Sequence, residues 1–493
     1  MSNLSELLPT GGGQNSVDFV ATGTLASGQT VALKTDGTVE AVAETSPSLD
    51  SFQGVFGLSL SASYSLSSVY VPTQDRTYFF WSDGSNMYNS SGTYNGTSWS
   101  FSAVSSAMFS AKRNYAVNVF YDSSLDKAVI VYELTGGYVG RTATARVLTF
   151  SGSTVSFGSA AEINYYGIQP DITGDNNGVF AASYTYYVGN SFGVRQITIS
   201  GTSIVLGGDE PSMLYNAGYG NTAPVAYCDS IDRYVMEDVT SSGTRHLTLF
   251  SIVGTTPTLV SGVNLSSSGN GSAPAALSWN SDAAKLYAFY ANSSTYATVA
   301  ICSVTASTIS VDSNTVISST TITNNQRVFS SAYNPDVKQV FIGMTQSTTT
   351  APVKYAVLSG TSPTFDVSAT NMYSSSDGSG VIISTSGNAG RFYIGFALQS
   401  APSSSFVYGS GYAATLTGTS NNSSSFIGIT SEAISSAATG AINTYGGINT
   451  AQTGLTIASD YYVQTDGSLS TTTSTVKAGQ AISATTINMM DLT

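Results

Sequence analysis

A short polar turn that ends in a basic residue recurs at intervals of 51 to 55 residues through most of this chain of 493 residues. Residues 120–132 read FYDSSLDKAVIVY, and the same order of apolar strand, polar turn, basic residue and apolar strand returns in YCDSIDRY and AYNPDVKQVF. The basic residues are Arg76, Lys127, Arg233, Lys285, Lys338 and Arg391, and Gly178 takes the corresponding place in one copy. A period of this length is the signature of a repeat architecture.

A second set of turns keeps the same period. Small hairpin sequences occur at 95–98, 151–154, 200–203, 254–257, 305–308, 359–362 and 417–420. Each copy also contains four apolar runs of strand length, with the alternation of a pleated strand. Four strands in each of seven copies predict an all-β fold, with a seven-bladed β-propeller over residues 54–423.

The charged residues of the repeated turn have a structural interpretation. Asp122 and Asp126 can accept hydrogen bonds from turn backbone, and Lys127 can form an ion pair or cover the neighbouring strand. The functional alternative is a calcium loop in the third copy, PDITGDNNG, whose oxygen ligands would be Asp171, Asp175, Asn176 and Asn177. That loop lacks the glutamate of a calcium-binding EF-hand and occurs once.

The flanking segments have a different composition, rich in Gly, Ala and Thr. Residues 25–39 are similar to 455–469, including an Asp-Gly pair in each that favours a tight hairpin. A second similarity joins 55–62 to 426–433. We expect residues 1–53 and 424–493 to form one small β domain, or two similar ones side by side, with the propeller inserted between them.

The same flanks carry a resemblance to known proteins. The opening MSNLSELLPTGGGQNSVDFVATG and the tail segments FIGITSEAISSAATGAINTYGG and GLTIASDYYVQTDGSL resemble the terminal segments of virion proteins from tailed bacteriophages, especially marine ones. The tail is also similar in style to small phage head-decoration domains. The resemblance implies a terminal domain that anchors a larger module on the particle. It implies no active-site residue.

Composition excludes several classes of function. The formal net charge is -13, and sixteen Lys and Arg are scattered along the chain, so we expect no nucleic-acid partner. The start lacks the features of a signal peptide and no stretch is long enough for a spanning helix. Cys228 and Cys302 are expected to be buried, and with His246 as the single histidine we expect no metal site and no cofactor.

Two classes of function are compatible with a propeller, an enzyme and a binding protein. A propeller glycosidase needs a carboxylate pair or an arginine cluster at its centre, and three of the nine arginines already belong to the repeated turn. Chemistry of the Ser-His-Asp type would depend on His246, which lies in an apparent strand. We therefore expect no enzymatic activity, with glycan cleavage as the alternative.

Tyrosines gather in the longer loops of copies two to four. These are Tyr138, Tyr165, Tyr166, Tyr186, Tyr187, Tyr215 and Tyr219. Tyrosine suits recognition of sugars or proteins because it combines a rigid apolar ring with a polar tip. We expect these residues to form a binding patch. The alternative is that they simply cover the blade ends. In a simply closed propeller, the chain would also enter the first blade and leave the last blade on the side that carries these tyrosines.

Together these features predict a virion structural protein that displays a propeller for host attachment, as a tail fibre or receptor-binding protein. Head decoration or a head fibre is the alternative, and a glycan-cleaving enzyme follows. The expected partners are other virion proteins through the terminal domain, a host-surface glycan or protein, and further copies of the chain. Its expected location is the virion, assembled in the host cytoplasm, without membrane insertion.

Overall fold

The computed structural model describes residues 15–45, 48–56, 66–82, 85–95, 98–111, 117–134, 142–186, 191–215, 223–239, 244–265, 275–292, 294, 296–321, 329–335, 339–345, 353–359, 365–373, 381–388, 391–400, 407–417 and 420–490. Regular structure in these ranges is β-strand, with three short 3-10 helices at Pro72–Gln74 (η2), Asp229–Ile231 (η3) and Ser423–Ser425 (η4). None of the described segments forms a helix able to cross a membrane. The all-β prediction is confirmed.

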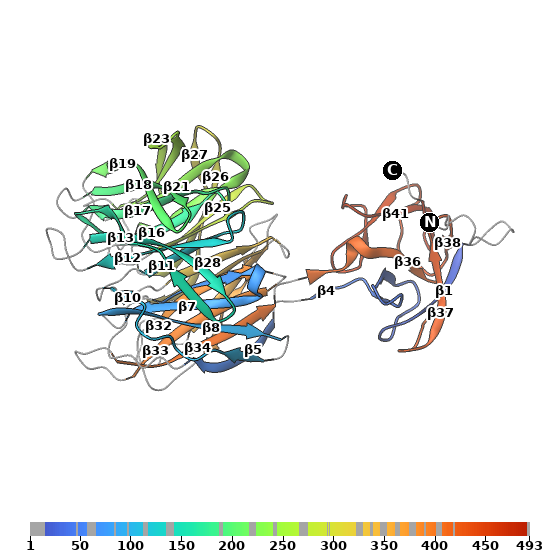
Figure 1. Ribbon diagram of the computed structural model, residues 1–493. Helices are drawn as coiled ribbons and strands as arrows, with labels where there is room; N and C mark the ends of the chain where they lie inside the picture. The colour runs from blue at the N-terminus through green and yellow to red at the C-terminus, as the bar shows by residue number, and fades with distance from the viewer. Residues whose placement is uncertain are drawn as a thin grey trace. The chain divides into compact units, whose positions relative to one another are not determined.

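The chain folds as two compact units, Met1–Ser46 with Thr419–Thr493, and Pro47–Gly418. The larger unit contains seven antiparallel sheets in its described part (Figure 1). Their first strands are Leu66–Val71 (β6), Val117–Asp122 (β11), Gly167–Gly174 (β16), Val225–Cys228 (β20), Ala276–Asn280 (β24), Phe329–Asn334 (β28) and Val381–Asn388 (β32). The second strands are Arg76–Ser82 (β7), Lys127–Leu134 (β12), Val179–Tyr186 (β17), Arg233–Val239 (β21), Lys285–Ala291 (β25), Gln339–Thr345 (β29) and Arg391–Ser400 (β33).

The third and outermost strands complete each sheet. The third strands are Asn86–Tyr94 (β8), Thr142–Ser151 (β13), Ser191–Ser200 (β18), Arg245–Val253 (β22), Tyr296–Val304 (β26), Val353–Ser359 (β30) and Val407–Thr417 (β34). In each of the first two sheets, two short strands share the outermost position. These are Trp99–Phe101 (β9) and Phe109–Ser110 (β10) in the first sheet, and Thr154–Phe157 (β14) and Ala161–Asn164 (β15) in the second. In the others it is Ser203–Tyr215 (β19), Thr256–Asn264 (β23), Ile309–Thr321 (β27), Phe365–Tyr373 (β31) and Ser48–Phe56 (β5).

The first strands contact one another in chain order, and β32 returns to contact β6. Apolar clusters fill the spaces between successive sheets; one such cluster holds Phe180 and Ile197 against Val129 and Val131 of the preceding sheet. A closed ring of radially packed four-stranded sheets is a β-propeller, in which closure limits the exposure of strand edges. The β-propeller predicted from the repeat spacing is therefore present.

The propeller closes in a way that the repeat spacing did not predict. Strand β5, from before the first sheet, pairs with β34 as the outermost strand of the last sheet, with Ser48 opposite Thr417. The predicted boundary at residues 53 and 54 thus falls inside a propeller strand, and Thr417 and Ser420 pair with Ser48 and Thr45 rather than with each other. The chain enters and leaves the propeller where the other sheets have their short third-to-fourth-strand turns, not on the tyrosine-rich side as expected.

The terminal unit contains two five-stranded sheets with the same topology. Module A consists of Ser16–Val20 (β1), Thr30–Leu33 (β2), Val39–Ala41 (β3), Phe426–Thr430 (β36) and Thr439–Thr444 (β37), in the order β1-β37-β36-β2-β3. Module B consists of Ile448–Asn449 (β38), Asp460–Val463 (β39), Leu469–Ser470 (β40), Lys477–Ser483 (β41) and Thr486–Asn488 (β42), in the order β38-β42-β41-β39-β40. Taken in chain order, the two arrangements are identical.

Local details of the two modules agree as well. The β2–β36 ladder has an irregularity between Val31 and Ala32, and the β39–β41 ladder has one between Tyr461 and Tyr462. A Cβ added to Gly428 would lie 2.3 Å from the carbonyl oxygen of Asn443, and one added to Gly479 would lie 2.1 Å from that of Asn488. The predicted similarity of 25–39 to 455–469 thus corresponds to equivalent hairpins. The similarity of 55–62 to 426–433 does not, because residues 55 and 56 lie in β5 and 426–430 form β36.

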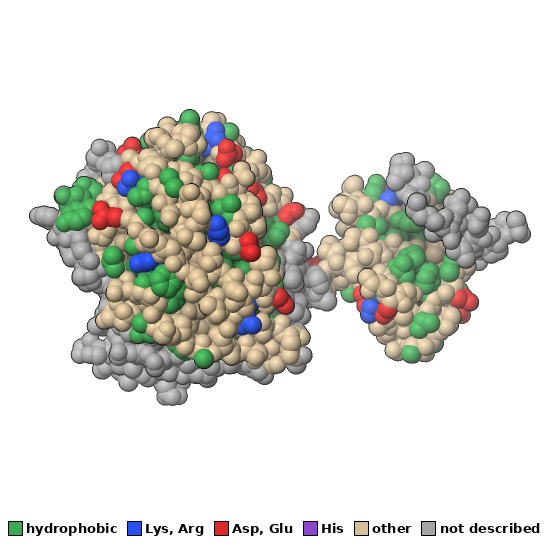
Figure 2. Space-filling model, viewed as in Figure 1, with side chains coloured by type: hydrophobic (Ala, Val, Ile, Leu, Met, Phe, Trp, Pro, Cys, Tyr) green, Lys and Arg blue, Asp and Glu red, His purple; other side chains and the backbone are tan. Residues whose placement is uncertain are grey.

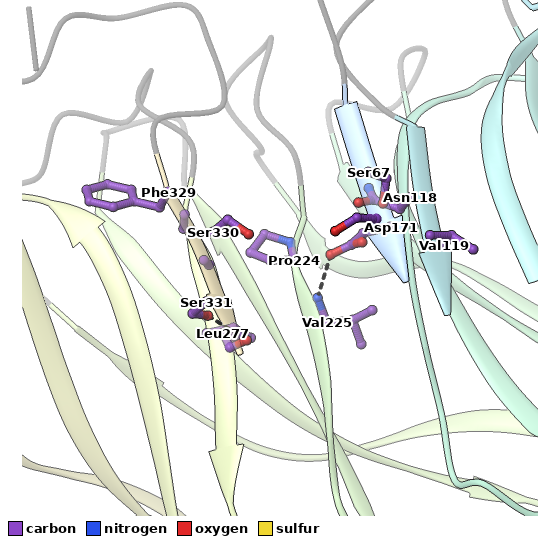
Figure 3. Close-up of a pocket in the computed structure, with 13 residues that line it drawn as sticks. Ser67, Asn118, Val119, Asp171, Pro224, Val225, Leu277, Phe329, Ser330 and Ser331 are labelled. Carbon is purple, nitrogen blue, oxygen red and sulfur yellow. Dashed lines mark hydrogen bonds between the residues drawn. The ribbon is translucent and has the colours of Figure 1, made fainter. Parts of the chain in front are cut away.

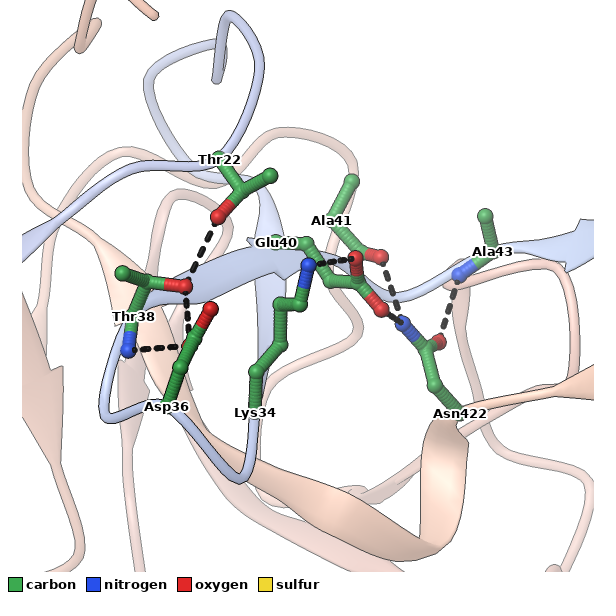
Figure 4. Close-up of polar contacts among 8 residues, drawn as sticks. All are labelled: Thr22, Lys34, Asp36, Thr38, Glu40, Ala41, Ala43 and Asn422. Atoms are coloured by element: carbon green, nitrogen blue, oxygen red, sulfur yellow. Dashed lines mark hydrogen bonds and ion pairs between the residues drawn. The ribbon is translucent and has the colours of Figure 1, made fainter. Parts of the chain in front are cut away.

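The propeller lies in one connection of module A. It interrupts the chain between β3 and β36, whereas module B joins the equivalent strands β40 and β41 directly through residues 471–476. The two segments that lead into and out of the propeller pair with each other as the short strands Glu44–Thr45 (β4) and Ser420–Asn421 (β35). Asn422 fastens them, donating to Glu40 Oε1 at 2.9 Å and the Ala41 carbonyl at 3.0 Å and accepting from the Ala43 amide at 2.9 Å (Figure 4).

Candidate functional site

The repeated turn locks neighbouring blades together. Asp122 is fully buried; its Oδ1 accepts from the amides of Ser124 and Leu125, and its Oδ2 accepts from the Gly178 amide of the next blade at 2.8 Å. Asp126 accepts from the Thr73 hydroxyl of the preceding blade at 2.7 Å and from Tyr121 at 2.6 Å. These aspartates therefore have a structural role, as predicted, because they bind groups of their own blade and of the neighbouring blades.

A tyrosine five residues before the aspartate recurs in the same turn. The hydroxyls of Tyr70, Tyr121 and Tyr227 donate to Asp75, Asp126 and Asp232. These aspartates have a positive φ, as do Ala284 and Gly178 at the matching position. Gly178 therefore corresponds to the residue before the basic one, not to the basic residue itself. The spacing of five was visible in the sequence and was missed there.

The predicted basic residues bind two kinds of partner. Lys127 Nζ donates to the Gly201 carbonyl at 2.7 Å, and Arg233 Nε donates to the Ala306 carbonyl at 2.8 Å, each in a short turn of the next blade. Arg76 donates to Ser91, and Lys285 donates to Ser303 and Asp312, all within their own blades. Arg391 begins β33, but its side chain, like all of Lys338, lies outside the described residues.

The calcium-loop alternative gains no support from the described residues. Asp175 accepts from the amides of Asn177 and Val179 at 2.7 and 3.0 Å, which is a local turn. Asp171 points elsewhere, toward the Val225 amide. Within the described ranges no three His, Cys, Asp or Glu side chains gather as metal ligands.

Three of the predicted tyrosines form a cluster beside the first two strands of the third sheet. Tyr165 and Tyr166 occupy the turn before β16, and Tyr186 ends β17. The Tyr165 and Tyr166 rings lie edge to face at 5.1 Å, and Tyr166 meets Tyr186 in the same way at 5.6 Å. Tyr165 is 46% exposed. Tyr138, Tyr187 and Tyr219 lie outside the described residues, and Tyr215 is placed in β19 by its backbone alone.

The turn that carries this tyrosine cluster rests on a polar network. Asn164 Oδ1 accepts from the Tyr166 amide at 2.8 Å, and Asn164 Nδ2 donates to Tyr184 at 3.1 Å and to Asp209 at 2.9 Å. Tyr184 also donates to Asp209. Burial, followed by the Asp209 carboxylate, raises the pKa of Tyr184. No sequence pattern marked Asn164 or Asp209, because their partners lie on different strands.

A cavity of about 160 Å³ lies among the first strands, at the centre of the ring (Figure 3). Its lining includes Ser67, Asn118, Asp171 and Ser331. Side chains tie adjacent first strands together around it, since Asn118 donates to the Pro170 carbonyl and Asp171 accepts from the Val225 amide. Asp171 is the one ionisable side chain among its described lining residues, so the carboxylate pair of a glycosidase is not found in that set.

A buried ion pair and a neighbouring contact between an aspartate and a histidine lie on the fourth sheet, on adjacent residues of β21 and β22. Arg245 Nη1 lies 2.5 Å from Glu237 Oε1, with both side chains 1% exposed. Burial raises the pKa of Glu237 to about 7, against the effect of Arg245. Asp238 accepts from Thr248 at 2.8 Å and lies 3.3 Å from His246 Nδ1. The Thr248 hydroxyl also lies 3.2 Å from His246 Nδ1, so it contacts both the carboxylate and the imidazole.

No family model matches the sequence, and no curated protein matches it significantly. Among solved structures, the chain is similar to AofleA from Arthrobotrys oligospora, with 10% identity over 73% of this chain and 96% of that chain and a TM-score of 0.43. It is also similar to a putative 6-phosphogluconolactonase from Bacteroides fragilis, with 11% identity over 71% and 94% and a TM-score of 0.41. It is similar as well to the NanB sialidase from Streptococcus pneumoniae, with 11% identity over 75% of this chain and 70% of that chain and a TM-score of 0.42. These TM-scores are below 0.5, so the similarities carry no functional argument.

Proposed function

We propose that this protein is a binding component of a bacteriophage particle, in which the propeller recognises a host-surface molecule through the tyrosine cluster and the terminal unit docks to the virion. The observation that carries the binding role is the cluster of Tyr165, Tyr166 and Tyr186, an aromatic surface in which Tyr165 is exposed and the other two rings are half-buried. Aromatic rings held in place before binding lose little side-chain entropy when a ligand arrives.

The rigidity of the support favours binding over a passive surface role. Asn164 holds the backbone of the Tyr165–Tyr166 turn, and its amide is fixed in turn by Tyr184 and Asp209. A partly buried network of this kind limits the conformations of the turn that it supports. The virion part of the proposal is supported by the resemblance of the terminal segments to those of tailed-phage virion proteins.

The first test is immunogold electron microscopy of purified virions with antibody against the propeller. Label on tail tips or side fibres would agree with host attachment, and label over the head would move the role to head decoration. The absence of label on every particle would overturn the virion assignment.

A second test measures binding directly. Purified protein is expected to compete with phage for adsorption to host cells, and Tyr165→Ala with Tyr166→Ala is expected to weaken this competition at least tenfold, as for a pair of aromatic hot-spot residues. Leu259→Ala provides a matched control, because Leu259 is an exposed apolar residue of the propeller outside the tyrosine cluster. Equal competition by the tyrosine variant and the control would overturn the binding role of the cluster.

A further inference from the structure

The two modules of the terminal unit stack through non-equivalent faces. We call the face that bears Val31 and Val39 the front of module A; the equivalent residues of module B are Tyr461 and Leu469. The front of module A has its own apolar cluster, with Leu25, Val31, Val39, Ile434 and Ile442. The front of module B instead shares a cluster with the back of module A, which contributes Ala32, Val42, Phe426 and Ile429. The stack is therefore head to tail.

A head-to-tail stack of two equivalent modules leaves one face of each kind without a module against it. On the front of module A, Leu33 is 40% exposed and Val17 is 41% exposed at the edges of the cluster. Leu33 lies opposite Val39 in the ladder and so on the same face. Figure 2 shows hydrophobic side chains at several places on the visible face of this unit.

The back of module B is the remaining face of the second kind, and it is more polar than the back of module A, because Lys477 and Gln480 occupy the register positions of Phe426 and Ile429. It presents Tyr462, which alternates with the buried residues Tyr461 and Val463 and is the equivalent of Ala32 in module A. Its charges are balanced, because Lys477 Nζ lies 2.9 Å from Asp460 Oδ2. An aromatic ring beside a neutralised ion pair can be covered without leaving an unpaired charge.

We infer that a second copy of this chain stacks on the first in the same sense as module B stacks on module A, with the back of module B of one copy against the front of module A of the next. The occupant follows from the interface within the chain, which this contact would continue. Repetition of a head-to-tail contact produces a ring if the rotation closes and an open chain if it does not. This inference does not depend on the proposed function.

The test uses the full chain and two variants, Leu33→Asp on the front of module A and Tyr462→Asp on the back of module B. Sedimentation equilibrium of the unchanged protein is expected to show concentration-dependent assemblies larger than a dimer. Each variant alone is expected to be monomeric, because one of the two complementary faces is charged. An equimolar mixture is expected to form a dimer and nothing larger, because each variant retains the face that the other has lost.

Ile457→Asp is the control, since Ile457 is exposed in the turn before β39, outside the strands of both sheets. This variant is expected to leave assembly unchanged. Thermal melting checks that each variant is folded, and Leu33→Ser and Tyr462→Ser replace any that is not. A monomeric wild-type chain, or assemblies that persist in both variants, would overturn the inference. Loss of assembly without recovery in the mixture would also overturn it, because that result indicates a contact between identical faces.

Discussion

Replacement of Asp122 by alanine tests the idea that the repeated turn joins neighbouring blades. The buried carboxylate accepts four hydrogen bonds, from the Ser124 amide and hydroxyl, the Leu125 amide and the Gly178 amide. A net value of about 1 kcal/mol for each bond gives roughly 4 kcal/mol. Water can reach the exposed Ser124 and replace part of this, so we expect Asp122→Ala to lower the free energy of unfolding by about 3 kcal/mol.

Two further substitutions separate the contribution of the buried Asp122 carboxylate from that of the exposed part of the turn. Asp122→Asn keeps one oxygen for the turn but turns an NH₂ group toward the Gly178 amide, so we expect a loss of about 1.5 kcal/mol. Asp126→Gly is the matched control in the same turn. Asp126 is exposed and has a φ of 50°, which glycine adopts freely. Its hydrogen bonds from the Thr73 and Tyr121 hydroxyls are also exposed, so water can replace them and its replacement is expected to cost less than about 1 kcal/mol.

Urea unfolding followed by tryptophan fluorescence measures these effects in the propeller alone, because Trp81, Trp99 and Trp279 are the three tryptophans of the chain and all lie in that unit. The free energy comes from the midpoint and slope of the transition. A loss for Asp122→Ala within about 0.5 kcal/mol of the control would refute the reasoning, because the buried carboxylate would then add nothing to the exposed turn.

Three other predictions follow from burial and close packing. Burial raises the pKa of Glu237 from 4.5 to about 7, so its contribution favours the folded state most below pH 4.5 and falls by up to about 3 kcal/mol as the pH rises through 7. The urea midpoint of the unchanged protein should be lower at pH 8.5 than at pH 5, and the gap between the two midpoints should be smaller in Glu237→Gln. An equal gap in the variant would contradict the assignment. Burial raises the pKa of the Cys228 thiol and raises that of Cys302 to about 12, so neither should react with a thiol reagent until urea unfolds the chain; rapid labelling of the native protein would disprove this. Gly428→Ala and Gly479→Ala should each lower the melting temperature of the terminal unit, since the new Cβ would meet a carbonyl oxygen at 2.3 or 2.1 Å, and differential scanning calorimetry that finds only one of the two destabilising would count against the equivalence of the modules.

Much of the propeller could be predicted from sequence because its turns depend on local chemistry. The positive φ of Asp75, Asp126 and Asp232 and the tight hairpins between third and fourth strands place characteristic residues at fixed spacings. Alternating apolar residues then identify the strands. The repeat spacing therefore predicted the order of the strands within each blade.

The closure of the ring could not be predicted in this way. Strand β5 is separated from its partner β34 by most of the chain, and its pairing depends on where the ring brings its ends together. The terminal modules show the same limit. The hairpins around Gly37 and Gly467 marked two similar segments, but only packing revealed that the modules stack head to tail.

The sequence by itself therefore determined the all-β class, the repeat and the chemistry of its turns, because each depends on residues within a few positions of one another. The tertiary structure decided what depends on distant partners. It brought Tyr186 to Tyr166, placed Asn164 against Asp209, and buried Glu237 beside Arg245. Contacts of this kind are made by side chains on different strands, and their identity is fixed only when the sheets have packed.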